Sequence, residues 1–413
     1  MKRILLVNAC LIGDNNGTGN TLASIFKNMP KSSVYQLCID FLREPLSNKQ
    51  CLFVDKNFSF SRYLLANRRK NKQQSEDAAK HRANISGARA SGFKAVLHEF
   101  FRGLADILPV RISKNMCNYI EEVKPDYIYT CGSSITSLKT SKKISKKYNI
   151  PLVLHVMDNW EETLYSSSVL TKPFSFLLKN ELKKVNKCSV QNLAVSQALC
   201  NKFSEKYKVN YLPLMNTVDE IAVNPVCYSR DKLTFMYGGS LSINRYESLA
   251  QIADVLHGVL GNDGYVFKLF VPSTQNTESM RSYFEGYNVV FSDYVPRQQL
   301  LVEYNEADVL VITESFDKNF CDFTKFSLST KVPEYMACGK PVLAYLSKML
   351  YSYEYLNSSN AALVADNRVF LAEAINEIQN YDKRYNLALN GLRFVKKNHS
   401  REYCSKVLSE IFK

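Results

Sequence analysis

Ser327-Leu-Ser-Thr-Lys-Val-Pro-Glu-Tyr-Met-Ala-Cys-Gly-Lys-Pro-Val342 is the stretch of this chain that decides its fold. A short helix can begin at Pro333, because proline suits the first helical position, and Ser329 or Thr330 can cap it. Gly339 suits the position just after a helix, and an apolar run follows it. The stretch therefore predicts a helix that leads into a buried strand, which is the repeating step of an α/β protein.

The start of this helix carries charges of both signs. The backbone N–H groups of residues 329–331 have no partner within a helix, so they can bind an anion, and Lys331 adds a positive charge. Glu334 lies in the first turn, where its carboxylate can accept two hydrogen bonds from a ribose diol. Alternatively, Glu334 only offsets the helix dipole. The local pattern leaves both interpretations open.

Short apolar runs alternate with helical stretches in two series along the chain. Strands of the first series are expected at 3–8, 34–39, 127–130, 152–156, 193–195 and 211–212, and strands of the second at 234–237, 267–271, 289–291, 309–312, 342–345 and 362–364. Apolar strands separated by helices, such as those at 135–148 and 174–185, indicate parallel sheets covered on both faces. We therefore predict an α/β protein with two doubly wound domains, a boundary within 218–231, and ligands at the carboxyl ends of the strands.

The composition is that of a soluble globular protein. Of the 413 residues, 46% are hydrophobic and 22% are charged, which excludes disorder of the whole chain. No run approaches the roughly 18 apolar residues that span a bilayer, and the apolar run at 4–7 is too short for a signal peptide. The eleven cysteines are scattered without a Cys-x-x-Cys pair. We therefore expect a cytoplasmic protein with free thiols and no zinc site.

The formal net charge of +14 is concentrated in one half of the chain. Residues 1–220 contain 33 Lys and Arg against 18 Asp and Glu, and segment 62–114 alone has 12 basic and 4 acidic side chains. This asymmetry suggests a polyanionic partner, either nucleic acid or an anionic membrane surface, although a solvated lysine-rich face has the same composition. The sequence contains no helix-turn-helix, zinc or aromatic RNA-binding signature, so nucleic acid ranks last as a partner.

Six stretches, taken in chain order, together resemble a known family. They are 4–8 with Gly17, Thr18 and Gly19; 152–158, which includes His155; 194–196; 212–219; 237–241 with Arg245; and 331–342. These stretches resemble the GT-B glycosyltransferases of the family 4 type over nearly the whole chain. The resemblance implies two Rossmann-like domains that face each other across a cleft. Residues 1–220 would bind the acceptor, residues 221–399 would bind the donor, and residues 400–413 would pack back on the first domain.

The resemblance implies a role for each matching residue of the second domain. Arg245 and Lys331 would neutralise the diphosphate of a nucleotide-sugar donor, and Glu334 would hold its ribose. Further donor contacts are expected from Gly238, Gly239, Ser240, Ser329 and Thr330 at the phosphates, and from Tyr294 and Val295 at the base. Alternatively, Arg245 is a surface arginine, and the turn at 293–296 is an ordinary loop.

The matching residues of the first domain would face the acceptor. His155 would act at the reaction centre, and the acceptor contacts are expected from Gly17, Thr18, Gly19, Asp158 and Trp160. The structural alternatives are that His155 belongs to the core, that residues 17–19 form a plain strand-to-helix turn, and that Trp160 packs at an interface.

The sequence departs from the family pattern at the donor site. The family has two glutamates eight positions apart, and Phe326 occupies the position of the first. Glu314 and Asp322 are the candidates to replace it. Ser240 stands where arginine is common, and Arg245 stands where lysine is usual. These departures indicate a divergent branch, and a catalytically weak GT-B scaffold is the alternative that they support.

The resemblance implies a retaining glycosyltransferase that works without a metal ion. No Asp-x-Asp motif and no cluster with metal-ligand spacing occurs in the sequence. UDP or GDP is the expected nucleotide, and no separate cofactor is expected. The acceptor would be a saccharide or a lipid-linked saccharide in the synthesis of lipopolysaccharide, O-antigen or capsule.

The basic half then suggests a peripheral location on the inner face of the cytoplasmic membrane. Between Phe93 and Leu108 the apolar residues recur at helical spacing, so this helix would lie on anionic lipid. Alternatively, the same spacing packs it into the core. Residues 66–92 are expected to form a polar, basic helix or loop.

Overall fold

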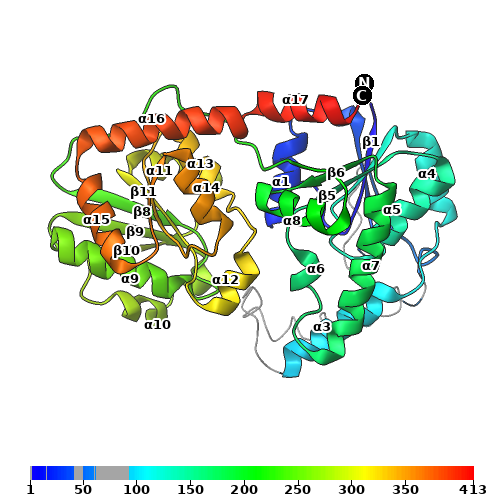
Figure 1. The fold of residues 1–413 in the computed structure, drawn as a ribbon, viewed down its shortest axis with the longest axis horizontal. Helices are drawn as coiled ribbons and strands as arrows, with labels where there is room; N and C mark the ends of the chain where they lie inside the picture. Colours follow the sequence, from blue (N-terminus) through cyan, green and yellow to red (C-terminus); the bar gives the residue numbers. More distant parts are fainter. Residues whose placement is uncertain (1, 15, 41–49, 60, 62–92) are drawn as a thin grey trace. The chain divides into compact units, whose positions relative to one another are not determined.

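A computed structural model describes residues 2–14, 16–40, 50–59, 61 and 93–413 of the chain. These residues form two units, which we describe separately (Figure 1). Unit 1 contains the described residues up to Asn216 together with Cys404–Lys413, and unit 2 contains Thr217–Tyr403. The boundary predicted from the sequence follows residue 220. The expected polar segment 66–92 lies outside the described residues.

Unit 1 is built on a parallel sheet of seven strands in the order β3-β2-β1-β4-β5-β6-β7. The strands are β1 (Ile4–Asn8), β2 (Val34–Cys38), β3 (Cys51–Phe53), β4 (Tyr127–Thr130), β5 (Leu152–Val156), β6 (Gln191–Ala194) and β7 (Tyr211–Pro213). The strands predicted in this half are confirmed, with their ends within two residues. Edge strand β3 was not predicted, because three residues are too few to show a periodic pattern.

The helices of unit 1 lie on both faces of this sheet. They are α1 (Gly17–Phe26), η1 (Lys31–Ser33), α3 (Phe93–Ile107), α4 (Lys114–Val123), α5 (Ile135–Tyr148), α6 (Trp160–Thr163), η2 (Val169–Thr171), α7 (Lys172–Cys188) and α8 (Gln197–Tyr207). Helix α17 (Arg401–Ile411) begins in unit 2 and ends in unit 1. Its side chains Cys404, Leu408 and Ile411 share one core cluster with α1 and the sheet of unit 1.

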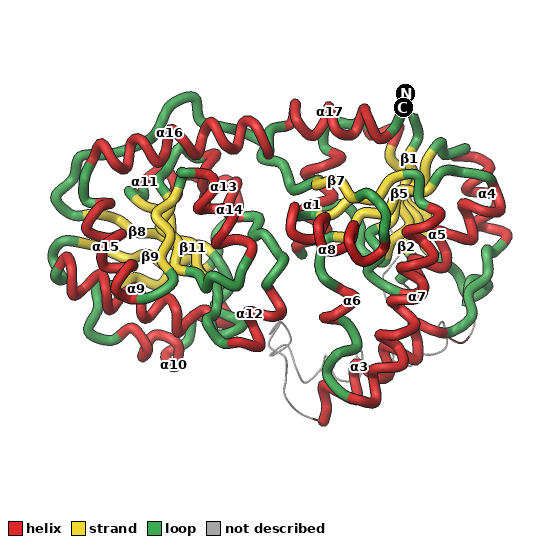
Figure 2. The backbone as a smooth tube through the Cα atoms, viewed as in Figure 1, coloured by secondary structure: helices red, strands yellow, loops and turns green. Residues whose placement is uncertain are grey.

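Unit 2 is built on a parallel sheet of six strands in the order β10-β9-β8-β11-β12-β13. The strands are β8 (Leu233–Gly238), β9 (Tyr265–Val271), β10 (Val289–Asp293), β11 (Val309–Thr313), β12 (Val342–Tyr345) and β13 (Ala362–Ala365). The helices are α9 (Arg245–Leu260), η3 (Ser273–Gln275), α10 (Glu278–Arg281), η4 (Ser282–Phe284), α11 (Arg297–Glu306), α12 (Lys318–Thr324), α13 (Lys331–Ala337), α14 (Tyr351–Ser359), α15 (Arg368–Ile378) and α16 (Tyr381–Asn398). Figure 2 shows these strands between two layers of helices.

Burial of the central strands explains why both sheets are parallel. Every residue of β1, β5 and β11 is buried, although successive side chains point to opposite faces of a sheet. Both faces must therefore be covered, and helices that connect parallel strands provide this cover. In unit 2, α9 and α15 contribute most of the helical residues of the core on one face. The predicted α/β fold with two doubly wound sheets is confirmed.

The strand order reverses once in each sheet. In unit 1 the chain adds strands on either side of the pair β1–β4, and in unit 2 on either side of the pair β8–β11. The loops that follow such a pair run in opposite directions and leave room at the carboxyl ends of the strands. This geometry predicts that a ligand of unit 2 would bind beside the residues that follow β8 and β11.

The helix that the sequence places at Pro333 begins earlier than predicted. Helix α13 starts at Lys331, and the side chain of Thr330 makes no capping hydrogen bond. Ser329 Oγ instead accepts a hydrogen bond from the backbone N–H of Lys331 at 3.4 Å. The end of the helix is as predicted, because Gly339 has a φ of +67°, a conformation that glycine adopts without strain. Among the described residues, no helix has the length and apolar character required to cross a membrane.

The core of unit 2 supplies a test of this packing. Leu249 of α9 is fully buried, so Leu249→Ala leaves a cavity and we expect it to lower the free energy of unfolding of unit 2 by about 2–5 kcal/mol. Val302→Ala removes a side chain that is 61% exposed, and we expect a change below about 0.5 kcal/mol. The free energy of unfolding of both variants is measured by urea unfolding, with tryptic cleavage of unit 2 as the signal. Equal effects of the two substitutions would contradict this packing.

Candidate active site

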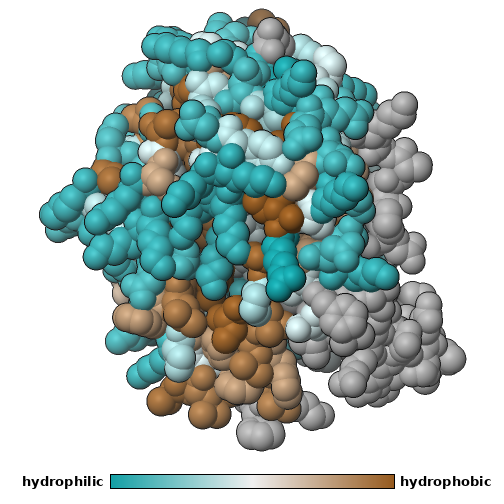
Figure 3. All heavy atoms as spheres, turned by 90° about the vertical axis from the view of Figure 1, so that its right-hand side faces the viewer, coloured by the Kyte–Doolittle hydropathy of each residue, from teal (hydrophilic) through white to brown (hydrophobic). Residues whose placement is uncertain are grey.

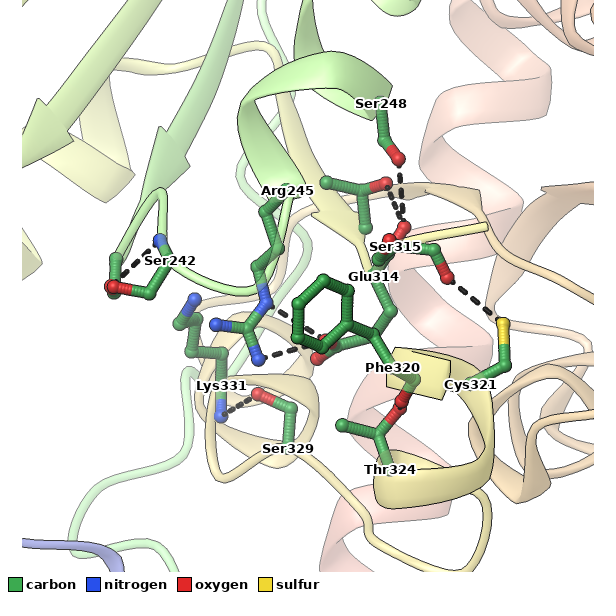
Figure 4. A network of polar contacts seen from close by, with 12 residues as sticks. Ser242, Arg245, Ser248, Glu314, Ser315, Phe320, Cys321, Thr324, Ser329 and Lys331 are labelled. Atoms are coloured by element: carbon green, nitrogen blue, oxygen red, sulfur yellow. Dashed lines mark hydrogen bonds and ion pairs between the residues drawn. The ribbon is translucent and has the colours of Figure 1, made fainter. Parts of the chain in front are cut away.

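Charged side chains gather where β8 and β11 end in unit 2. Gly238 is the last residue of β8, and Glu314 follows the last residue of β11. These two strands are hydrogen-bonded neighbours at the point where the strand order reverses. Arg245 at the start of α9 and Lys331 at the start of α13 lie close to Glu314, as Figure 4 shows. Four sequence-distant segments thus meet at one edge of the sheet.

Arg245 and Glu314 form a short, largely buried ion pair in this cluster. The Nε and Nη2 atoms of Arg245 each lie 2.8 Å from Oε2 of Glu314, and both side chains are largely buried. A guanidinium that donates one hydrogen bond to a carboxylate and pairs with it through a second nitrogen has little freedom to rotate. Ser248 Oγ also donates to the backbone carbonyl of Glu314 at 2.9 Å, which ties α9 to the end of β11.

Lys331 approaches the same place from the opposite side. Its Nζ donates a hydrogen bond to the hydroxyl of Tyr237 at 3.2 Å and lies 4.3 Å from the centre of that ring. A Cβ atom at Gly239 would lie 2.0 Å from Lys331 Nζ, so only glycine admits the lysine here. The glycine that the sequence analysis assigned to phosphate contacts therefore also makes room for the ammonium group.

The charges at this edge do not balance. Burial, together with the neighbouring positive charge of Arg245, lowers the pKa of Lys331 to about 7, while Glu314 and Glu334 oppose the shift. Figure 4 shows the ammonium group beside the guanidinium. Two cations therefore share the nearby carboxylate of Glu314. An anionic ligand at this position would favour the protonated form of Lys331.

A cavity of about 220 Å³ borders this cluster. Its lining consists of Arg245, Glu314, Thr324, Ser327, Leu328, Ser329 and Ser352. Hydroxyl groups thus predominate beside one carboxylate and one guanidinium, a lining suited to the hydroxyl groups of a sugar. Asp322, the other candidate to replace the missing glutamate, is exposed on α12 and does not line this cavity.

Glu334 faces a different partner. Its Oε1 lies 3.0 Å from Nη2 of Arg297, at the start of α11. Burial raises the pKa of Glu334, although Arg297 and Lys331 oppose this shift. Arg297 is more exposed than Glu334, so the ion pair lies at the surface of unit 2. No motif or spacing in the sequence predicts Arg297 as a partner.

The remaining candidate donor residues lie around this edge of unit 2. Ser240 Oγ contacts the hydroxyl of Ser242 and the side chain of Gln275, which orders the loop after β8. Ser329 lines the cavity, and Thr330 precedes α13. Tyr294 and Val295 follow β10, and the Tyr294 side chain is exposed. The structure thus brings Ser329 to the cation cluster.

His155 of unit 1 lies inside its strand and is buried. The strand continues beyond it to Val156, and His155 has no exposed surface. Its Nδ1 is hydrogen-bonded to the hydroxyl of Tyr129, and burial lowers the pKa of its imidazole to about 3. The imidazole is neutral and enclosed in this structure, so we assign His155 to the core of unit 1, and a contact with the acceptor stays a prediction.

The other candidate acceptor residues are also engaged in local structure. Gly17, Thr18 and Gly19 form the first turn of α1, and Asn16 caps this turn by accepting from Gly19 N at 2.9 Å. A Cβ atom at Gly19 would lie 2.5 Å from the carbonyl oxygen of Asp14, so close packing requires this glycine.

The two remaining acceptor candidates flank the start of α6. Asp158 accepts a hydrogen bond from Asn159 N at 2.7 Å. Trp160 is partly buried against the core cluster of unit 1. The structure shows local or packing contacts for both residues.

Two polar residues at these edges escaped the sequence analysis. Tyr237 reads as one more apolar strand position, yet its hydroxyl contacts Lys331 and donates to the carbonyl of Ser240 at 2.8 Å. Asn8 ends β1, is 2% exposed, and has a buried Nδ2 atom without a partner among the described residues. An asparagine that ends a strand at the reversal point was the available signal. Within the described ranges, no three or more His, Cys, Asp or Glu side chains cluster in a way that could hold a metal ion.

Comparisons with known proteins identify the fold. No protein-family model and no curated protein matches the sequence. The sucrose-phosphate synthase of Thermosynechococcus elongatus aligns with a TM-score of 0.64 and 12% identity, over 100% of this chain and 98% of that one. A lipopolysaccharide outer core galactosyltransferase aligns with a TM-score of 0.56 and 13% identity, over 99% of both chains. A UDP-forming trehalose-phosphate synthase of Burkholderia vietnamiensis aligns with a TM-score of 0.58 and 10% identity, also over 99% of both. All three have the GT-B fold.

The buried state of His155 predicts sensitivity to acid. The unfolded chain binds a proton at this residue below about pH 6.5, whereas the folded chain does not until about pH 3. Stability from this source is therefore complete above pH 6.5 and falls by up to about 1.4 kcal/mol per pH unit as the pH drops from 6.5 towards 3. We expect His155→Gln to remove this slope in unfolding measured between pH 7 and 5. His98→Gln, at an exposed position, is the control, and a slope unchanged in His155→Gln would refute the assignment.

Proposed function

We propose that this chain, whose fold is that of GT-B glycosyltransferases, transfers a sugar from a nucleoside-diphosphate donor bound in unit 2. One observation carries the proposal: Arg245 and Lys331 converge at the carboxyl ends of β8 and β11, where Glu314 pairs with Arg245 and Lys331 forms no ion pair within the described residues. A diphosphate would supply further negative charge beside Arg245 and Lys331. Guanidinium and ammonium groups both bind phosphate strongly.

The same two cations would assist the departure of the nucleotide. As the bond between the sugar carbon and the phosphate oxygen breaks, negative charge grows on that oxygen, and preorganised cations stabilise it. The acceptor hydroxyl forms the new bond to the sugar carbon and gives its proton to the leaving phosphate oxygen. This route retains the configuration and requires neither a protein base nor a metal ion. We infer retention and the absence of a metal ion from the resemblance to the GT-B family.

The nucleoside would lie beside α13 and the turn after β10. Glu334 would release the exposed Arg297 and accept hydrogen bonds from the ribose diol, since a half-buried carboxylate with a raised pKa gains from any donor that reaches it. Backbone groups at Tyr294 and Val295 would border the base. UDP is the first nucleotide to test, because a similar structure is that of a UDP-forming enzyme, and GDP is the second.

Glu314 is our candidate to replace the missing family glutamate. It lines the cavity of about 220 Å³ together with Thr324, Ser327 and Ser329, whereas Asp322 does not. The transferred sugar would occupy this cavity and bond these hydroxyl groups. Glu314 would hold Arg245 in place and also accept from a sugar hydroxyl.

For the acceptor we propose a saccharide or a lipid-linked saccharide used in a surface polysaccharide. One similar structure is that of a lipopolysaccharide galactosyltransferase, while others act in sucrose or trehalose synthesis, so the acceptor must be found by experiment. We place the enzyme in the cytoplasm, at the inner face of the membrane. A catalytically weak scaffold is the second candidate, because Phe326 stands where the family has a glutamate.

Lys331→Met tests the donor site. We expect UDP or GDP to bind the wild type and to bind this variant about tenfold to a hundredfold more weakly, because one charge-assisted hydrogen bond is lost. Lys232→Met, an exposed lysine of the same unit, should bind as the wild type does. Isothermal titration calorimetry measures all three. Absence of nucleotide binding by the wild type would argue against the transferase.

Nucleotide binding should also take up a proton. At pH 8 the free Lys331 is mostly neutral, since its pKa is about 7, and a bound diphosphate raises that pKa. Titrations in buffers of different ionisation enthalpy should therefore show an uptake that approaches one proton in the wild type and none in Lys331→Met. The same uptake in both proteins would assign the proton to another group.

Glu314→Gln separates donor binding from transfer. We expect it to retain nucleoside-diphosphate binding within a few-fold and to reduce the turnover of the cognate sugar nucleotide by about a hundredfold, because the sugar loses a preorganised contact. Asp322→Asn is the matched control and should keep full turnover. Glycosyl transfer or donor hydrolysis is measured by release of the nucleoside diphosphate. If Asp322→Asn is the impaired variant, the two residues exchange roles. If the wild type binds nucleotide without turnover, the scaffold is favoured.

A further inference from the structure

One end of unit 1 exposes a group of large apolar side chains. This apolar end consists of Leu97, Phe101 and Leu104 of α3, Val169 and Leu170 of η2, and Phe176 and Leu177 of α7. Val169 is 73%, Leu170 63% and Phe176 64% exposed. Figure 3, which faces unit 1, shows hydrophobic residues gathered at the bottom of the view. An apolar area gathered from several elements marks a surface that binds something.

Internal packing holds these side chains outward. Helix α3 packs against η2 and α7, and the rings of Phe100 and Phe174 meet edge to face at 5.6 Å. A Cβ atom at Gly103 would lie 2.3 Å from the Phe174 ring, so glycine lets α3 lie directly on α7. Residues 100 and 103 thus form the inner face of α3. Leu97, Phe101 and Leu104 follow helical spacing on its outer face.

A lysine-rich surface adjoins the apolar end. Helices α5 and α7, which pack against each other, contain five lysines each, and Glu181 of α7 is their only carboxylate. Glu181 is already bound to Lys142 and Lys184 at 2.6 Å. The other lysines therefore leave a large positive excess. Lys172, Lys183 and Lys187 are exposed and form no ion pair within the described part of the chain.

We infer that the apolar end and the lysines of α5 and α7 form a docking surface for an anionic lipid bilayer. Apolar side chains enter the boundary between headgroups and acyl chains, and lysines beside them bind the anionic headgroups. A second copy of this chain would cover the apolar side chains, but joining the same surfaces would bring two sets of ten lysines and one carboxylate together without compensating their charge. The inference deepens the proposed function, since it supplies the surface on which a lipid-linked acceptor would be met, and it rests on that function only for this role.

The test is sedimentation of the full chain with vesicles. We expect binding to vesicles of phosphatidylcholine mixed with phosphatidylglycerol, weak binding to phosphatidylcholine alone, and release at high salt. Leu170→Ser with Phe176→Ser should weaken binding at least tenfold. A triple variant should bind the anionic vesicles more weakly, by roughly fivefold per lysine removed. It carries Lys172→Gln, Lys183→Gln and Lys187→Gln. These positions are exposed, so circular dichroism and the thermal midpoint should be unchanged.

Matched controls lie in unit 2. Val302→Ser removes an equally exposed apolar side chain, and Lys232→Gln, Lys396→Gln and Lys397→Gln together remove three exposed lysines. Both should bind vesicles as the wild type does. No binding by the wild type, or equal losses in test and control variants, would overturn the inference. So would a wild-type dimer that Leu170→Ser with Phe176→Ser converts to a monomer.

Nucleotide binding is measured on the same proteins. The serine and glutamine variants of the docking surface should retain nucleotide binding, and Lys331→Met should retain vesicle binding. A failure of the docking surface is thus distinguishable from a failure of the donor site.

Discussion

Burial of parallel strands on both faces is the constraint on which this structure depends. The central strands of each sheet have no exposed residues, so no charged side chain can stand along them. Polar chemistry is therefore confined to the strand ends and to the loops beyond them. Where the strand order reverses, in the pair β8–β11, the two loops diverge and leave room for a ligand. The position of the candidate active site follows from this arrangement.

Close packing then decides which charges meet at that edge. Gly239 has no side chain, so Lys331 can reach the ring of Tyr237. Glu314 holds the guanidinium of Arg245 from the end of the neighbouring strand. The lysine remains the group whose charge can change, because burial and Arg245 oppose its proton. The anion that we propose here would favour the protonated lysine, so its binding free energy would include the proton that the lysine regains.

Much of the fold could be predicted because the strands are both short and apolar. The strands at Tyr127–Thr130, Leu152–Val156 and Val342–Tyr345 have the bounds that the sequence predicts. The helix start at Pro333 was wrong by two residues, because Ser329 begins the turn through its own backbone and hydroxyl. For His155 the sequence left two alternatives open, for a different reason. A histidine in an apolar strand has the same local sequence pattern whether its side chain points into solvent or into the core. Only the contact with Tyr129 shows that the side chain of His155 lies in the core.

The sequence by itself determined the two parallel sheets, the positive charge of the first half and the identity of the two cations that meet where β8 and β11 end. These features depend on residue type and on spacing of a few positions, which local physics can interpret. The tertiary structure alone decided that Glu314 pairs with Arg245, that Glu334 meets Arg297, and that three elements expose their apolar residues at one end of unit 1. Each of these is a contact or a surface made by segments far apart in the chain, and no spacing along the sequence encodes which of them the fold brings together.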